Sequence, residues 1–247
     1  MDGVWISTSG PRRAWALVSA PWSTEVLTAL TDADVEGLTL APTSEVREGG
    51  GLDGLDRLES LRALEVGWAR VPPLPVATLR RVEELALTGT GGERIELADL
   101  AEVRSLELRP GRASGALSDV PHLEVLSTRG MPADGLASLD GCRSLTVVRM
   151  HGRGVTRPGW NDAPASVSSL VLSGIALDSL DGIGDLRDLN DLALETGRAA
   201  RGLVLDLAPL ARLPRLRVVT ADGYAGYRNV DVARGAVQTV RLGPAPA

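Results

Sequence analysis

A six-residue pattern of apolar residues returns along most of the chain at nearly constant spacing. Each copy has the form apolar-x-x-apolar-x-apolar, and the copies begin at Val35, Leu61, Val82, Val103, Leu123, Leu145, Val167, Leu189, Leu216 and Val237. The intervals between neighbouring copies are 26, 21, 21, 20, 22, 22, 22, 27 and 21 residues. Periods of this length are typical of stacked structural repeats. The spacing therefore predicts a solenoid in which each repeat packs on its neighbours.

The stretch 177–194 indicates what one repeat contains. Apolar residues occur there at every third position from Leu177 to Leu192, and the step then shortens to two between Leu192 and Leu194. A spacing of three suits tight turns and 3₁₀ segments, whereas a spacing of two suits a strand. Intervals of 20–22 residues leave no room for a long helix. We therefore expect a short strand in each repeat, followed by 3₁₀ turns or very short helices.

Copies such as Leu61-x-x-Leu64-x-Val66 and Leu189-x-x-Leu192-x-Leu194 resemble leucine-rich repeats of the short class, which has about 22 residues per repeat. The resemblance covers residues 35–242, as about nine or ten repeats. It implies an α/β repeat solenoid that is curved, with a parallel concave β-sheet and a convex side of 3₁₀ or short helices.

The chain departs from this family at one position in each turn. Leucine-rich repeats usually have Asn or Cys eight positions after the first leucine, and the Asn ladder is missing here. The residues at that position are Ala69, Thr90, Gly111, Met131, Arg153, Ile175, Gly197 and Tyr224. Glycines lie one position earlier in five repeats, at Gly89, Gly130, Gly152, Gly174 and Gly223. We expect the chain to turn at these glycines with positive φ.

The two ends of the chain do not follow the repeat. We expect residues 1–34 to form an N-terminal capping segment, with strands at 4–6 and 15–18 and a helix over 24–30 that has Ser23 as its N-cap. Trp5, Trp15 and Trp22 could cover the open apolar end of the first repeat or could form a binding surface. Residues 42–56 read as a surface loop, 199–213 as an extra strand with a helical turn, and 243–247 as a disordered tail.

Composition excludes several classes of protein. The net charge of −6 argues against general nucleic-acid binding, although a local basic patch could exist. No apolar run is long enough to span a bilayer, and residues 1–3 do not begin a basic secretory signal. The single Cys142 excludes an internal disulfide framework and a zinc site with several cysteines. All 26 basic residues are Arg, which fits a high-GC coding background. We expect a cytoplasmic, bacterial protein.

The residues between the apolar positions of each strand should line the concave face in columns. This alignment places four basic residues together at its middle: Arg109, Arg129, Arg149 and His151. Carboxylates flank them, with Glu65, Glu84 and Glu107 on one side and Asp191, Glu195 and Asp222 on the other. Trp68 is a candidate anchor at the same edge. Two alternatives stay open: the carboxylates could neutralise the arginines as a solvated lattice, or the alignment could slip by one residue.

No catalytic motif appears in the sequence. The absence of Lys excludes a Walker-type phosphate loop and Schiff-base chemistry. We expect Cys142 to be a small core residue, and we expect no metal or cofactor. The sequence favours a monomeric, non-catalytic module that binds a partner protein through its concave face, as an immunity or antitoxin-like inhibitor or as an adaptor. One alternative is an enzyme that uses His151, beside Ser127 or Ser173, and the arginines on an acidic small substrate. A third possibility is a structural scaffold that self-associates through uncapped ends.

Overall fold

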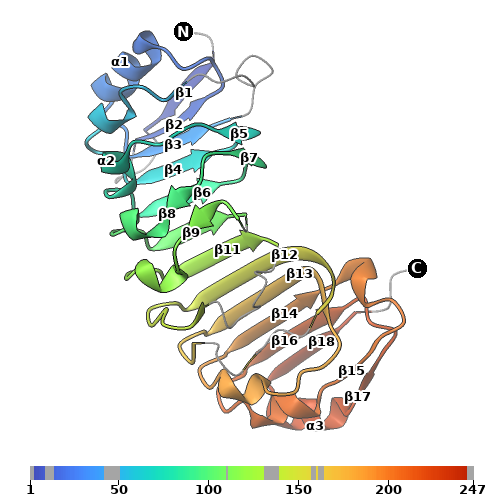
Figure 1. Ribbon diagram of the computed structural model, residues 1–247. Coiled ribbons are helices and arrows are strands. Elements are labelled where there is room, and N and C mark those ends of the chain that lie inside the picture. The colour runs from blue at the N-terminus through green and yellow to red at the C-terminus, as the bar shows by residue number, and fades with distance from the viewer. Residues whose placement is uncertain are drawn as a thin grey trace. The chain divides into compact units, whose positions relative to one another are not determined.

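The computed structural model describes residues 3–8, 14–41, 51–109, 111–130, 139–156, 160 and 164–243, with the backbone alone at 155–156. The chain divides into two units, Met1–His122 (unit 1) and Leu123–Ala247 (unit 2). In each unit the main strands run side by side as a ladder (Figure 1). Among the described residues, no helix is both long and apolar enough to cross a membrane.

Unit 1 contains a ladder of six strands. In spatial order they are β1 (Val4–Ser7), β2 (Trp15–Val18), β3 (Gly37–Leu40), β4 (Ala63–Val66), β6 (Glu84–Leu87) and β9 (Ser105–Leu108). β1 pairs with β2 antiparallel, and every later pair is parallel. Helix α1 (Thr24–Asp32) and helix α2 (Val76–Leu79) lie at one end of these strands (Figure 1).

Unit 2 also contains a ladder of six strands, and all of its pairs are parallel. The order is β11 (Val125–Arg129), β12 (Val147–Thr156), β13 (Ser169–Leu177), β14 (Asp191–Glu195), β16 (Val218–Asp222) and β18 (Thr239–Leu242). Helix α3 (Val230–Ala236) precedes the last strand. Both β12 and β13 continue well past the repeat motif, with a register shift between His151 and Gly154 that the spacing did not predict.

Turns and short pairs connect the main strands. Among the described residues, the 3₁₀ segments include η1 (Leu55–Arg57), η2 (Leu97–Asp99), η3 (Leu117–Asp119), η6 (Ile183–Asp185), η7 (Gly197–Ala200) and η8 (Ala208–Arg212). In the part of the chain that the structure describes, three small parallel pairs lie outside the ladders: β5 (Arg70–Val71) with β7 (Gly91–Gly92), β8 (Ile95–Glu96) with β10 (Ala113–Ser114), and β15 (Val204–Asp206) with β17 (Gly226–Arg228). The expected extra strand and helical turn within 199–213 are β15 and η8.

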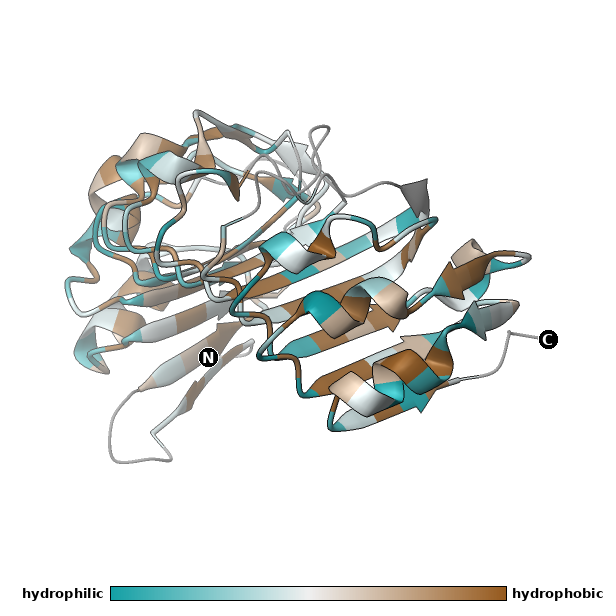
Figure 2. Ribbon diagram, turned by 90° about the horizontal axis from the view of Figure 1, so that it is seen from below, coloured by the Kyte–Doolittle hydropathy of each residue, from teal (hydrophilic) through white to brown (hydrophobic). Residues whose placement is uncertain are grey.

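The repeat pattern places the core between the strands and the 3₁₀ turns. In β6, Leu85 and Leu87 are 2% and 0% exposed, whereas Glu84 is exposed. Apolar and polar residues alternate in this way along the strands (Figure 2). Side chains three residues apart stack in a 3₁₀ turn, and Leu180 and Ile183 are accordingly buried around η6. The predicted fold class, an α/β repeat solenoid with a parallel sheet and 3₁₀ or short-helix connections, is confirmed.

The N-terminal segment contains the elements expected from its sequence. β1 and β2 lie at the predicted strands, and α1 begins after Ser23, whose hydroxyl accepts a hydrogen bond from the N–H of Val26 at 3.3 Å. Whether residues 1–34 act as a cap stays a prediction. The expected turn at 9–11, most of the loop at 42–56 and residues 244–247 of the expected tail lie outside the described residues.

The glycines of the turns have two different roles. Gly130, Gly174 and Gly223 have the predicted positive φ, with values of 141°, 71° and 80°. The prediction of positive φ is wrong for Gly89 and Gly152. A Cβ atom at Gly89 would lie 2.1 Å from the carbonyl oxygen of Trp68, so this glycine permits close approach between neighbouring turns.

Candidate functional site

The strand face of unit 2, defined here as the surface formed by the residues that alternate with the buried ones, carries its side chains in aligned columns. One column contains Arg129, His151, Ser173, Glu195 and Asp222. A second contains Ser127, Arg149, Val171, Ala193, Thr220 and Arg241. Both columns follow the order predicted from the sequence, because the repeat length keeps equivalent residues in register. The alternative of a one-residue slip is therefore excluded for these strands.

Three of the four predicted basic residues are neighbours on this face. Arg129 lies opposite His151 on the adjacent strand, and Arg149 lies two residues before His151 on β12. All three side chains are exposed. Arg129 and Arg149 lie at diagonal positions on adjacent strands, so their positive charges repel one another. We call Arg129, Arg149 and His151 the basic cluster.

Arg149 has no carboxylate beside it in its column. Its cross-strand neighbours are Ser127 and Val171, and no hydrogen bond or ion pair of its guanidinium group occurs among the described residues. An exposed planar guanidinium group can bind a carboxylate or phosphate through two parallel hydrogen bonds. The alternative in which neighbouring carboxylates neutralise the arginines therefore does not apply to Arg149.

Three carboxylates form an acidic cluster farther along the same face. Glu195 on β14 lies opposite Asp222 on β16, and Asp191 begins β14 on the same side. The hydroxyl of Ser173 donates a hydrogen bond of 2.8 Å to Oε2 of Glu195. Strand β13 separates the two clusters with neutral residues. The strand face of unit 2 thus has a positive part and a negative part about two strand spacings apart, which is about 10 Å.

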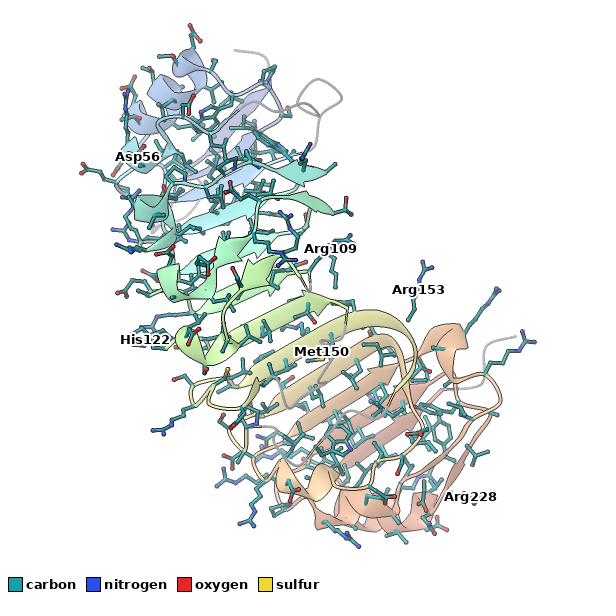
Figure 3. All side chains as sticks on the ribbon, viewed as in Figure 1. Asp56, Arg109, His122, Met150, Arg153 and Arg228 are labelled. Carbon is teal, nitrogen blue, oxygen red and sulfur yellow. The ribbon has the colours of Figure 1, made fainter. Side chains whose placement is uncertain are left out.

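The remaining charged candidates belong to unit 1. Glu65, Glu84 and Glu107 lie on its strand face, and Glu107 is opposite Ala86. Arg109 follows the end of β9, where its Nε donates a hydrogen bond of 3.1 Å to the carbonyl oxygen of Thr88 (Figure 3). The grouping of Arg109 and Glu107 with the basic cluster stays a prediction.

Trp68 corrects the sequence interpretation. It was expected to be a surface anchor, but its side chain is only 4% exposed and belongs to the core of unit 1. Trp68 follows β4 by two residues, at a position where Val66 and Val71 on either side are also buried. A buried tryptophan at this point contributes packing to the repeat and offers no surface to a partner.

The three N-terminal tryptophans differ in exposure, and their role in capping or in binding stays a prediction. Trp15 is half-buried above Gly37, and its Nε1 donates a hydrogen bond of 3.1 Å to Oγ1 of Thr39. Trp22 is half-buried and donates a hydrogen bond of 3.0 Å to the carbonyl oxygen of Asp53. Trp5 is 65% exposed, and its cross-strand neighbour Leu17 is 38% exposed. Trp5 and Leu17 therefore form an exposed apolar pair on the strand face of unit 1.

The groups that catalysis would need are not joined in this arrangement. Ser173 lies opposite His151, but its hydroxyl donates to Glu195, and no hydrogen bond links it to His151 among the described residues. Burial, with a smaller effect of Asp140, raises the pKa of the Cys142 thiol to about 11, and the side chain is 3% exposed. Cys142 is thus a core residue, as predicted. No group of three or more His, Cys, Asp or Glu side chains is placed to hold a metal ion in the part of the chain that the structure describes.

Solved structures share the fold of this chain. An internalin C2 of Listeria monocytogenes is 17% identical, with a TM-score of 0.50, and the match covers 78% of this chain and 83% of that one. A second internalin of the same species is 16% identical, with a TM-score of 0.54, over 90% of this chain and 70% of that one. No protein-family model and no curated protein matches the sequence. The strand ladders, the 3₁₀ connections and these structural neighbours show that the chain has the leucine-rich repeat fold.

Proposed function

We propose that the chain is a non-catalytic recognition module that binds a partner protein through the strand face of unit 2. The observation that carries the proposal is the exposed basic cluster, in which Arg149 has no counter-ion among the described residues. Like charges on adjacent strands repel one another, so their presence together on an exposed face favours a role in binding a partner. The internalin-like fold supports a protein partner in a general way.

The order of charges on this face defines the partner's chemistry. A complementary surface carries acidic groups opposite the basic cluster and basic groups opposite Asp191, Glu195 and Asp222. The two sets would be about 10 Å apart, as the spacing of β12 and β14 requires. Half-buried Val125, Val147 and Val218 add apolar area to the same face. Such complementarity sets the orientation of the complex and raises the association rate.

Within this function, an inhibitor that occludes its target, such as an immunity or antitoxin-like protein, ranks slightly above an adaptor. Occlusion needs only a complementary face, whereas an adaptor needs a second binding site. The described geometry supplies no observation that favours the enzyme alternative.

Charge reversal on the face tests the proposal. Arg129→Glu combined with Arg149→Glu should greatly reduce the amount of partner captured from the native cell extract. A matched control is Arg187→Glu combined with Arg234→Glu, because both of these exposed arginines lie off the strand face and the change in net charge is the same. Equal capture by both double variants would contradict the proposal.

A single substitution separates recognition from catalysis. If the chain only binds a partner protein, His151→Ala should weaken capture of that partner and have no other effect. If the chain is an enzyme, the same change should abolish turnover of an acidic substrate while the partner is still captured. Raising the salt concentration should lower the association rate of a partner that the basic cluster attracts.

A further inference from the structure

The outer edge of β1 is open for pairing. β1 is the first strand of the unit 1 ladder, and no strand pairs with its outer edge among the described residues. The carbonyl oxygen of Gly3 accepts a hydrogen bond of 2.7 Å from the N–H of Ser19 in the antiparallel ladder with β2. Hydrogen-bonded pairs alternate in such a ladder, so Trp5 bonds toward β2 and the peptide groups of Val4 and Ile6 point outward.

The apolar side chains of β1 are incompletely covered. Val4 and Ile6 are only half-buried, whereas Ala16 and Val18, their neighbours on β2, are 0% and 1% exposed. The apolar core of unit 1 is therefore partly exposed to solvent at β1. Trp5 is exposed on the other face of the same strand. A repeat array with an apolar end needs a cover for that end.

Edge strands usually carry features that prevent pairing with other chains. Charged residues, proline and bulges are the common ones. β1 has the sequence Val-Trp-Ile-Ser and contains none of them. By contrast, β18 at the edge of unit 2 carries the exposed Arg241. The open edge of β1 is therefore suited to accept another strand.

We propose that β1 pairs antiparallel with β1 of a second copy of this chain, around a two-fold axis at Trp5. In this register Val4 exchanges two hydrogen bonds with Ile6 of the partner subunit, and Ile6 exchanges two with the partner subunit's Val4. Trp5 then lies beside the partner subunit's Trp5, on one face of a sheet that continues through both copies. A two-fold axis makes the contact self-complementary and closed, as in most homodimers.

Charge favours a second copy over an acidic or basic partner. The eight residues of β1 and β2 include no charged side chain, so two copies meet along this edge without opposing like charges. Glu65, two strands farther along the same face on β4, accepts a hydrogen bond of 3.2 Å from the hydroxyl of Thr39. The net charge of −6 is carried by other surfaces. The proposed dimer differs from the monomer that the sequence led us to expect, and the oligomeric state decides between them.

Disulfide trapping tests the register of the proposed pairing. Residues opposite each other in a pair without hydrogen bonds have Cα atoms about 4.5 Å apart, which is within the range for a disulfide. Trp5→Cys should therefore give a covalent dimer under mild oxidation at high protein concentration, because the disulfide traps the pair even though loss of the tryptophan weakens it. Leu17→Cys is the matched control, since Leu17 lies on the same face one strand inward. The parent protein, whose single cysteine is buried, should stay uncrosslinked.

Sedimentation velocity of the full chain tests the dimer itself. We expect a concentration-dependent species of twice the chain mass of 25.9 kDa. Trp5→Lys should raise the dissociation constant at least about thirtyfold, as loss of a central tryptophan usually does. Val204→Lys, a control at an exposed valine of unit 2, should leave the dissociation constant unchanged. Circular dichroism establishes that each variant is folded.

Three results would overturn the proposal. The first is a parent protein that stays at 25.9 kDa at every attainable concentration. The second is a dimer that persists unchanged in Trp5→Lys. The third is equal crosslinking of Trp5→Cys and Leu17→Cys. An extended strand from another protein could still bind the edge in the first case, but the second copy would be excluded.

Discussion

The backbone N–H of Leu177 donates a hydrogen bond of 3.0 Å to the phenolic oxygen of Tyr224, which lies 47 residues later in the chain. Tyr224 is 1% exposed, and its ring packs at 5.8 Å between centroids against the ring of Tyr227. The hydroxyl of Tyr227 donates to the carbonyl oxygens of Ala221 and Gly243. The two tyrosines therefore connect the long strand β13 to the last strands of unit 2.

Replacing Tyr224 with phenylalanine should destabilise unit 2. The change removes the acceptor for the Leu177 N–H and leaves a buried donor unpaired, which costs about 1–3 kcal/mol. Urea denaturation followed by circular dichroism measures the loss. Tyr227→Phe is the comparison, because it removes a hydroxyl that serves two carbonyl oxygens from a half-buried position. A Tyr224→Phe protein as stable as the parent would contradict the structural role of this hydrogen bond.

Tyr224 should also make the fold sensitive to alkaline pH. Burial raises the pKa of Tyr224 from 10.0 to about 12, so the folded state holds its proton more tightly than the unfolded state. The resulting stability is complete below pH 10 and is lost as the pH rises toward 12. The unfolding free energy of the parent should therefore fall over this range more steeply than that of Tyr224→Phe. Parallel curves for the two proteins would show that Tyr224 does not cause the loss.

Gly174→Ala should destabilise the protein for two reasons. Gly174 has a φ of 71°, and an added Cβ would lie 2.2 Å from the carbonyl oxygen of Gly152. The left-handed conformation alone costs an L-residue about 1–2 kcal/mol. Gly202→Ala isolates this strain, because Gly202 has a φ of 85° and no atom within 4 Å of the added Cβ. Thermal unfolding should show a larger loss for Gly174→Ala, and equal losses would mean that the clash is relieved without cost.

Trp68→Ala should cost about 3–5 kcal/mol of stability, as is usual for a large side chain removed from a core. The burial of Trp68 predicts this value, whereas removing an exposed tryptophan would lower the free energy of unfolding only a little. Chemical denaturation gives the number, and the exposed Val76→Ala in the same unit provides the control. A small effect of Trp68→Ala would restore the interpretation of Trp68 as a surface residue.

Arg149→Ala should leave the unfolding free energy within about 0.5 kcal/mol of the parent value. Its side chain is exposed and makes no hydrogen bond or ion pair among the described residues. Val148→Ala, one residue earlier and 0% exposed, should be clearly destabilising in the same urea titration. A large loss from Arg149→Ala would mean that the basic cluster serves the fold, which would remove the main support for the binding function.

The spacing of apolar residues predicted the strands and their columns because each repeat must bury apolar side chains at the same positions of its strand. Every strand of the ladders needs buried side chains at alternate positions, as at Leu85 and Leu87, and the next strand needs them at the same depth. A nearly constant repeat length then places Arg129 opposite His151 and Glu195 opposite Asp222. This part of the candidate site could be written from the sequence alone.

The exposure of the tryptophans could not be predicted in this way. Trp68 follows β4 and is 4% exposed, whereas Trp5 lies within β1 and is 65% exposed, because burial depends on how the neighbouring strands and turns cover the residue. The extension of β12 past His151 and the hydrogen bond from Ser173 to Glu195 likewise depend on contacts between repeats. These contacts do not recur from repeat to repeat, so the periodic pattern in the sequence could not predict them.

The sequence by itself determined the repeat and the side chains that lie in each column of the strand face of unit 2. It could do so because local apolar spacing and a uniform repeat length suffice for these features. Only the tertiary structure decided that Arg149 has no carboxylate in its column, that Trp68 is buried, and that no described strand pairs with the outer edge of β1. These properties arise between residues far apart in the chain, where packing and hydrogen-bond partners are set by the folded neighbours of each residue.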